Sequence, residues 1–78
     1  SLYLLSNTPT ESFIDQRIAD LNIPASTLVA IIRRHGKIIV PRGHTVLKEG
    51  DRITVIGDPA GIERLYELYR QRRGVVSR

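Results

Sequence analysis

The chain has 78 residues, a formal net charge of +4 and no cysteine. This length allows one domain, and because domains of this size bury only roughly 60% of the surface that their unfolded chains expose, a partner or a second copy would add stability. The composition excludes a disulfide framework and a thiolate metal site, and no apolar run approaches the roughly 18 residues that span a bilayer, so the chain itself is expected to be soluble.

The N-terminal residues predict a strand followed by a turn. Residues 2–5 are apolar or aromatic, and residues 6–10 are the Ser, Asn, Thr and Pro that favour turns. Because the strand begins at the second residue, we expect the chain to be a fragment of a longer polypeptide.

The segment after this turn allows two interpretations. Residues 8–11, Thr-Pro-Thr-Glu, match a capping box with Pro at the first helical position, which would begin one helix over 9–21. That helix would place three apolar residues on one face, Ile14, Ile18 and Leu21. In the second interpretation, residues 12–14 are extended and a shorter helix starts near Arg17. Pro24 disfavours helical geometry at the preceding residue, so the helix ends there in either case.

Three further strands are predicted in the middle of the chain. Residues 27–32 are almost wholly apolar, which is typical of a central strand that is covered on both faces. His and Gly at 35–36 predict a hairpin turn into a strand at 37–40, and residues 48–51 predict a turn into a strand at 52–56. In the last strand, alternation places two residues on one face, Ile53 and Val55, and three on the other, Arg52, Thr54 and Ile56.

Several turn residues are expected to shape the backbone and not to contact a ligand. Gly43 and Gly50 can adopt a positive φ without a Cβ clash, and Asp51 can accept hydrogen bonds from backbone amides at a turn. A cation ligand role for Asp51 is the less favoured alternative. The residues assigned to turns are Pro24, Gly36, Gly43, Gly50 and Asp51.

The C-terminal part predicts an amphipathic helix that packs on the sheet. Asp58 followed by Pro59 is typical of a helix start. The expected buried face is Ile62, Leu65, Tyr66 and Tyr69, with Leu68 beside it. The predicted fold is α+β, with about four largely antiparallel strands and two helices in the order β-α-β-β-β-α. Residues 1–73 form a single domain in this interpretation, and residues 74–78 form a basic, frayed tail.

The residues needed for catalysis or for metal binding are not arranged in a recognisable set. His35 and His44 have no identifiable third ligand. No G-x-S-x-G elbow marks a nucleophile, and neither G-x-G-x-x-G nor G-x-x-x-x-G-K-[ST] is present to hold a nucleotide phosphate. We therefore expect a binding module with no catalytic residues and no metal.

Basic residues are concentrated in two stretches. One holds Arg33, Arg34, Lys37, Arg42 and Lys48 with no acid among them, and the other is the tail with Arg70, Arg72, Arg73 and Arg78. Such stretches suit phosphate-rich partners, an acidic protein or an anionic membrane surface, or they are simply solvated. Nucleic acid is the less favoured partner, because the aromatic residues that would stack on bases lie outside the basic stretch: Tyr3, Phe13, Tyr66 and Tyr69.

The hairpin region supplies the candidate ligand-binding residues. Arg33 and Arg34 leave their strand on opposite faces, so at most one of them points into any one pocket. The full set of candidates is Arg33, Arg34, Lys37, Ile38 and Pro41.

Ordered motifs along the chain resemble those of one known family. Residues 18–24 are followed by I-x-R-x-G at 32–36, P-x-G-x-T-x-L at 41–47 and Gly-Asp at 50–51. This order resembles the C-terminal RCK domain, also called the TrkA-C domain, over about half to two-thirds of the chain. Where that family often has Gly before the first helix, this chain has Asp15, and the resemblance favours the shorter helix.

The resemblance implies a regulatory function. Domains of this family are α+β units on the cytoplasmic side of potassium channels, potassium uptake systems and cation/proton antiporters, where they pair with a second copy and regulate transport. A homodimer is therefore implied, with a membrane-embedded transporter or channel as its partner and no enzymatic activity. Residues 21–24 and 41–45 look closest to copies fused to antiporters.

A ligand is a further implication of the resemblance. Some family members bind cyclic di-AMP across the dimer interface through an arginine whose position is Pro24 here, so that contact is not carried over. A sensor for cyclic di-AMP or another anionic nucleotide remains an alternative function. A basic module that binds nucleic acid or a membrane surface is the third.

Overall fold

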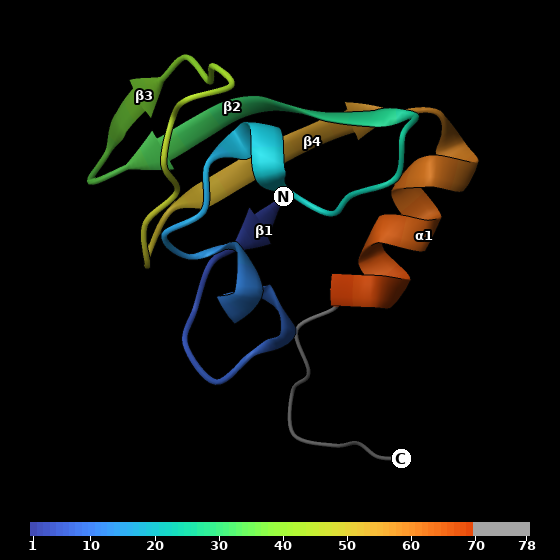
Figure 1. Cartoon of the computed structure of the whole chain (residues 1–78), viewed down its shortest axis with the longest axis horizontal. Helices are drawn as coiled ribbons and strands as arrows, with labels where there is room; N and C mark the ends of the chain where they lie inside the picture. The colour runs from blue at the N-terminus through green and yellow to red at the C-terminus, as the bar shows by residue number, and fades with distance from the viewer. Residues whose placement is uncertain (70–78) are drawn as a thin grey trace.

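A computed structural model describes residues 1–69 and shows one four-stranded sheet in the order β1-β4-β2-β3, with every neighbouring pair antiparallel (Figure 1). The strands are β1 (Leu2–Tyr3), β2 (Thr27–Arg34), β3 (Lys37–Ile39) and β4 (Arg52–Gly57). The helices are the 3-10 turns η1 (Pro9–Phe13) and η2 (Ile18–Asp20) and the α-helix α1 (Pro59–Tyr69). The α+β prediction is confirmed. The predicted domain end at residue 73 and the basic tail lie outside the described residues.

The β2–β3 hairpin turns through two residues. His35 has a φ of +52° and Gly36 a φ of +77°, and the flanking residues Arg34 and Lys37 are paired across the strands. Positive φ at both central positions is the geometry of a type I′ turn, which suits the right-handed twist of a hairpin. The hairpin prediction is confirmed, although His35 adopts a conformation that usually favours Asn or Gly.

A bulge in β2 decides which of its side chains face the core. Val29 pairs with Val55 and Ile31 pairs with Thr54, so Ala30 is an extra residue in the ladder with β4. An extra residue shifts the alternation by one position. One face of β2 therefore carries Leu28, Ile31 and Arg33, and the other carries Val29, Ile32 and Arg34.

The helical elements all pack on one side of this sheet (Figure 1). That side holds the hydrophobic core of Leu2, Leu4, Phe13, Val29, Ile32, Leu47, Ile53 and Leu65. On the opposite side Leu28 is 54% exposed and Ile31 is 38% exposed. The prediction that both faces of residues 27–32 are covered is therefore wrong for the single chain, because α1 and the 3-10 turns all lie on the core side.

The first predicted helix is replaced by two short 3-10 turns separated by Asp15. Asp15 has a φ of +68°, which interrupts the helical backbone, and its amide donates to the carbonyl of Leu47 at 2.7 Å. The prediction of one helix over 9–21 is wrong, because the backbone around Asp15 hydrogen-bonds to a distant segment. The shorter alternative is nearer to the structure, since Arg17 is the N-cap of η2. Its prediction that residues 12–14 are extended is wrong for Ser12 and Phe13, which lie in η1.

The helix α1 begins as predicted. The Asp58 side chain accepts a hydrogen bond from the Gly61 amide at 2.7 Å, which satisfies a backbone donor of the first turn. A Cβ at Gly61 would overlap the hydroxyl of Ser26, so the helix start approaches the residues before β2 closely. Leu65 is fully buried against the sheet.

Candidate functional site

The side of the sheet away from the core carries a cluster of exposed apolar and cationic side chains, which we call the open face. Three of its apolar residues are more than half exposed: Leu28 at 54%, Ile38 at 57% and Ile56 at 52%. Contiguous exposed apolar surface on a soluble domain often marks an interaction site. The open face consists of Tyr3, Leu28, Ile31, Arg33, Ile38, Arg52 and Ile56.

Two arginines lie directly opposite each other on the open face. Arg33 of β2 pairs with Arg52 of β4, and the same row continues to Tyr3 on one side and Ile38 on the other. The Arg52 guanidinium lies 5.6 Å from the centre of the Tyr3 ring. Among residues 1–69, neither arginine has a carboxylate oxygen within 4 Å. Like charges opposite each other in a ladder are unfavourable unless an anion compensates them.

The structure brings some of the predicted ligand-binding residues together and separates others. Arg33 and Ile38 are direct cross-strand partners on the open face. Arg34 and Lys37 are also partners, but by alternation they lie on the other face at the end of the hairpin. Pro41 is half-buried beyond the end of β3. The five predicted residues therefore do not line one surface.

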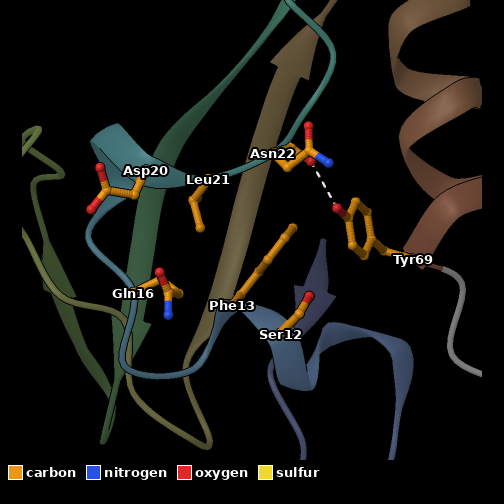
Figure 2. A pocket seen from close by; sticks show the side chains of 7 residues that line it. All are labelled: Ser12, Phe13, Gln16, Asp20, Leu21, Asn22 and Tyr69. Atoms are coloured by element: carbon orange, nitrogen blue, oxygen red, sulfur yellow. Dashed lines mark hydrogen bonds between the residues drawn. The ribbon is translucent and has the colours of Figure 1, made fainter.

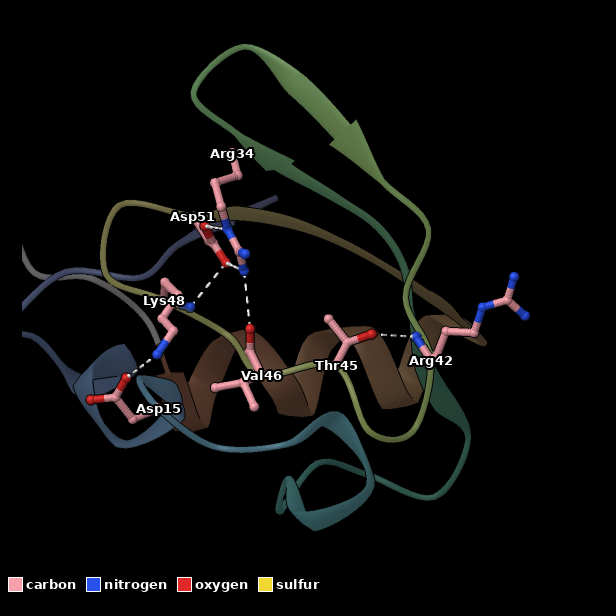
Figure 3. Close-up of polar contacts among 7 residues, drawn as sticks. All are labelled: Asp15, Arg34, Arg42, Thr45, Val46, Lys48 and Asp51. Atoms are coloured by element: carbon pink, nitrogen blue, oxygen red, sulfur yellow. Dashed lines mark hydrogen bonds and ion pairs between the residues drawn. The ribbon is translucent and has the colours of Figure 1, made fainter.

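Arg34 is engaged in a buried ion pair on the core side (Figure 3). Its Nε and Nη2 donate to the two carboxylate oxygens of Asp51, each at 2.8 Å, and Nη2 also donates to the Val46 carbonyl at 3.0 Å. The Lys48 amide donates to Asp51 at 3.0 Å. The Asp51 side chain is only 1% exposed. These bonds connect β2 to the turn before β4. The Arg34 guanidinium group therefore already has its partners within the domain and is not free to contact a ligand.

The environment of this pair shifts both pKa values toward the charged states. Burial opposes ionisation of Asp51, but hydrogen bonds from Arg34 and the Lys48 amide, with the charges of Arg34 and His35, outweigh it and lower its pKa. The hydrogen bond to Asp51 raises the pKa of Arg34 against the effect of burial, and the charge of Asp51 adds to it. The pair is therefore ionised under neutral conditions.

The turn around Asp51 has the geometry predicted from the sequence. Gly50 has a φ of +89°, and the Asp51 carboxylate accepts a hydrogen bond from the Lys48 amide, three residues earlier. Gly43 also lies in a turn, but its φ is outside the left-handed region. A Cβ there would make an ordinary contact of 3.7 Å with Ala19, so positive φ does not explain the glycine at 43.

A shallow pocket of about 200 Å³ lies on the core side, between the 3-10 turns and the end of α1 (Figure 2). Phe13 and Tyr69 contribute rings whose centroids are 4.5 Å apart, and the Tyr69 hydroxyl donates to the Asn22 carbonyl at 2.7 Å. Asp20 at its rim is paired with Arg17. None of the predicted ligand-binding residues lines this pocket, and several of its polar groups already have partners in the fold.

The residues that the structure describes form neither a metal site nor a membrane-spanning helix. Within residues 1–69, no three His, Cys, Asp or Glu side chains are grouped so that they could hold a metal ion. His35 and His44 are both exposed and lie in turns. None of the helices up to residue 69 has the length and apolar character required to cross a membrane.

Arg52 was not among the residues predicted to bind a ligand. Its place in the row with Arg33 depends on the pairing of β2 with β4, which are separated by the β3 hairpin and a loop. The predicted alternation did place Arg52 on the same face as Ile56, and both are exposed. The sequence therefore did contain a signal for Arg52: a basic residue on the face of the last strand that carries Arg52, Thr54 and Ile56.

Comparisons with known proteins agree on one family. The family model of the TrkA-C domain matches residues 4–70. The chain is 40% identical over 52 residues to a Trk system potassium uptake protein TrkA homolog of Archaeoglobus fulgidus, covering 67% of this chain and 12% of that protein. It is 33% identical over 58 residues to a K(+)/H(+) antiporter NhaP2 of a Shewanella species, covering 74% of this chain and 10% of the antiporter.

Solved structures share the fold. An RCK domain with cda superposes with a TM-score of 0.71 and 22% identity, covering 88% of this chain and 93% of the other. The RCK_C domain dimer of S. agalactiae BusR in complex with c-di-AMP gives a TM-score of 0.65 and 23% identity, covering 86% of this chain and 88% of the other.

Proposed function

The chain belongs to the TrkA-C domain family, and from this membership and the open face we propose that it is a cytoplasmic regulatory domain of a cation transport protein. It acts as a homodimer and carries no catalytic activity. Its partner is the membrane-embedded portion of a potassium uptake system, channel or cation/proton antiporter. The similar potassium uptake protein and K(+)/H(+) antiporter support this context.

The observation that carries the proposal is the exposure of the open face. Leu28, Ile38 and Ile56 extend across three strands and are each more than half exposed. A second copy that covers this surface would bury the apolar side chains, which a domain of 78 residues needs more than a larger one. The structural neighbour described as an RCK_C domain dimer supports a paired arrangement.

Regulation follows if the dimer has two arrangements that differ in their affinity for a signal. A ligand shifts such an equilibrium only by the difference between its affinities for the two states. The arrangement of the two copies would then set the activity of the attached transporter. A surface that faces a second copy is well placed for this role, because a ligand held there contacts both copies.

Self-association can be tested by sedimentation equilibrium of the 78-residue chain. We expect a dimer for the natural sequence and a folded monomer for Leu28→Lys, because an added ammonium group would be buried against a second copy of a face that carries apolar side chains and arginines and no carboxylate. Leu68→Lys is the matched control, since Leu68 is 49% exposed on α1, which packs on the core side. A natural chain that stays monomeric at high concentration would contradict the proposal.

A second candidate function is a sensor for cyclic di-AMP or another anionic nucleotide. The two structural neighbours, described with cda and with c-di-AMP, favour this candidate. Of the five predicted contacts, Arg33 and Ile38 lie together on the open face. Arg34 is paired with Asp51, Lys37 lies on the other face and Pro41 lies beyond the end of β3, so this candidate places only the first two in one site. Titration calorimetry with cyclic di-AMP tests it, and the absence of heat at millimolar ligand would remove it.

A further inference from the structure

We propose that the outer edge of β3 binds an extended, acidic segment of another polypeptide as an added antiparallel strand. The interaction uses the unpaired backbone groups of Ile38 and Val40, and basic side chains at both ends of the edge select for acidic residues. A strand added there extends the sheet and leaves the open face uncovered, so the inference is independent of the proposed homodimer.

The backbone of β3 is paired on one side only. β3 is the last strand of the sheet and pairs only with β2 (Figure 1). The residues that flank a two-residue turn form a hydrogen-bonded pair, here Arg34 and Lys37, and such pairs alternate with non-hydrogen-bonded pairs along an antiparallel ladder. The amide and carbonyl of Ile38 therefore point away from β2, and those of Val40 follow at the same spacing. Within residues 1–69, no backbone group of another segment bonds to Ile38 or Val40.

The opposite edge of the sheet, at β1, is closed by the chain itself. The Leu4 amide donates to the Asp51 carbonyl, so the carbonyl of the preceding residue, Tyr3, points outward. The Thr10 hydroxyl, which is fully buried, donates to that carbonyl at 2.7 Å. No other part of residues 1–69 caps the edge of β3 in this way. An unpaired edge of this kind is a template for a further strand.

The side chains along the β3 edge are apolar and accessible. Ile38 is 57% exposed and Val40 is 66% exposed, whereas Ile39 between them packs against the core. Directly opposite residues of a ladder point to the same face, so an added strand would place two of its own residues beside Ile38 and Val40. Apolar residues suit these two positions. Main-chain hydrogen bonds would supply affinity, and the two side-chain contacts would set the register.

The charges beside this edge favour an acidic partner over a second copy. Lys37 lies at one end of β3, and Arg42 follows the other end with a side chain that extends away from the domain (Figure 3). Among residues 1–69, neither has a carboxylate oxygen within 4 Å. Two β3 edges paired with each other would bring these cations near one another, whereas carboxylates on an added strand would compensate them.

The test is a nuclear magnetic resonance titration of the 78-residue chain with the blocked peptide Glu-Thr-Val-Thr-Val-Glu, whose valines would lie opposite Ile38 and Val40. We expect saturable shifts of the amide signals of these two residues and slower exchange of their amide protons with solvent. A peptide with both glutamates replaced by lysine should bind about fivefold more weakly, because two exposed attractive pairs become repulsive.

Substitutions at position 40 separate the backbone from the side chain. Val40→Pro removes the outward amide, which no hydrogen bond within residues 1–69 uses, so the chain should stay folded and lose binding. Val40→Thr is the matched control, because it keeps the amide and the β-branched shape, and it should retain binding. Lys37→Gln should reduce the preference for the acidic peptide, whereas Arg64→Gln on the exposed surface of α1 should leave it unchanged.

Several results would overturn the proposal. The absence of shifts at Ile38 and Val40 would exclude strand addition at β3, as would binding that survives in Val40→Pro. Equal affinity for the acidic and the basic peptide would exclude selection by charge. Shifts at these two residues that depend on the concentration of the chain and need no peptide would show that a second copy occupies the edge.

Discussion

The core side of the sheet and the open face differ in whether their arginines are paired with a carboxylate. Arg34 points to the core side, where Asp51 binds it through two hydrogen bonds of 2.8 Å. Arg33, the preceding residue, points to the open face and has no carboxylate within 4 Å among residues 1–69. Two neighbouring arginines thus differ in whether their charge is compensated inside the domain.

This difference separates residues that build the domain from residues available to a partner. A charge on the core side must be paired, because removing it from water is costly. A charge on the open face keeps its hydration in the single chain and can be compensated later by a ligand or a second copy. Substitutions on the two sides should therefore affect different measurements.

The largest contrast is expected for the adjacent isoleucines of β2. Ile32 is fully buried, and Ile32→Ala should lower the free energy of unfolding by roughly 2 to 5 kcal/mol through lost burial and the cavity left behind. Ile31 is 38% exposed on the open face, so Ile31→Ala should cost less and should instead weaken self-association. Urea unfolding at low protein concentration measures the first effect, and sedimentation equilibrium measures the second.

A milder pair of variants keeps this comparison measurable if Ile32→Ala does not fold. Ile32→Val should still lose about 1 kcal/mol. If Ile31→Val lowered the stability of the monomer as much as Ile32→Val does, the open face would not be a solvent-exposed surface in the single chain.

The second contrast concerns the buried ion pair. Asp51→Asn keeps the shape of the side chain but leaves the Arg34 charge uncompensated, which should cost about 3 kcal/mol at pH 7. Arg33→Gln removes the neighbouring charge and should leave the stability of the monomer nearly unchanged. Urea unfolding of both variants at pH 7 measures the difference.

The pH dependence of Asp51→Asn provides an independent check. Because the pKa of Asp51 is lowered in the folded state, its stabilisation is complete above the unfolded pKa of about 3.9 and is lost as the pH falls below that value through the folded pKa. The stability difference between the natural chain and Asp51→Asn should therefore shrink on acidification below about pH 4. A difference that stays constant down to pH 2 would show that the carboxylate charge does not stabilise the fold.

Local patterns were sufficient to predict most of the regular elements. The β-branched runs of β2 and β4, the two-residue hairpin turn and the Asp58 cap of α1 each depend on residues close together in the sequence. The turn role of Asp51 followed from Gly50 beside it. The same local reasoning placed Arg33 and Arg34 on opposite faces without locating the partner of either.

The features that local patterns did not predict depend on contacts between distant segments. The bulge at Ala30 arises in the ladder with β4. The split of the first helix depends on Asp15 and Leu47, which are far apart in the chain but hydrogen-bonded. The pairing of Arg33 with Arg52 requires the strand order of the sheet. The open face could not be recognised before these long-range pairings were known.

The smallest expected effect concerns an exposed ion pair, which contrasts with the buried pair at Arg34. Asp15 and Lys48 are 3.1 Å apart, and their side chains are 70% and 55% exposed, so the pair should contribute little. Asp15 also has a φ of +68°, which glycine adopts without a Cβ penalty.

Asp15→Gly should therefore leave the free energy of unfolding unchanged or raise it by up to about 1 kcal/mol, because relief of backbone strain is opposed by the greater freedom of glycine in the unfolded chain. Lys48→Ala is the matched control, since it removes the same ion pair and keeps the strained backbone. Urea unfolding of both variants separates the two contributions. If Asp15→Gly and Lys48→Ala destabilised the domain equally and by more than about 1 kcal/mol, the exposed pair would stabilise the fold as the buried pair does, and burial would not be what distinguishes them.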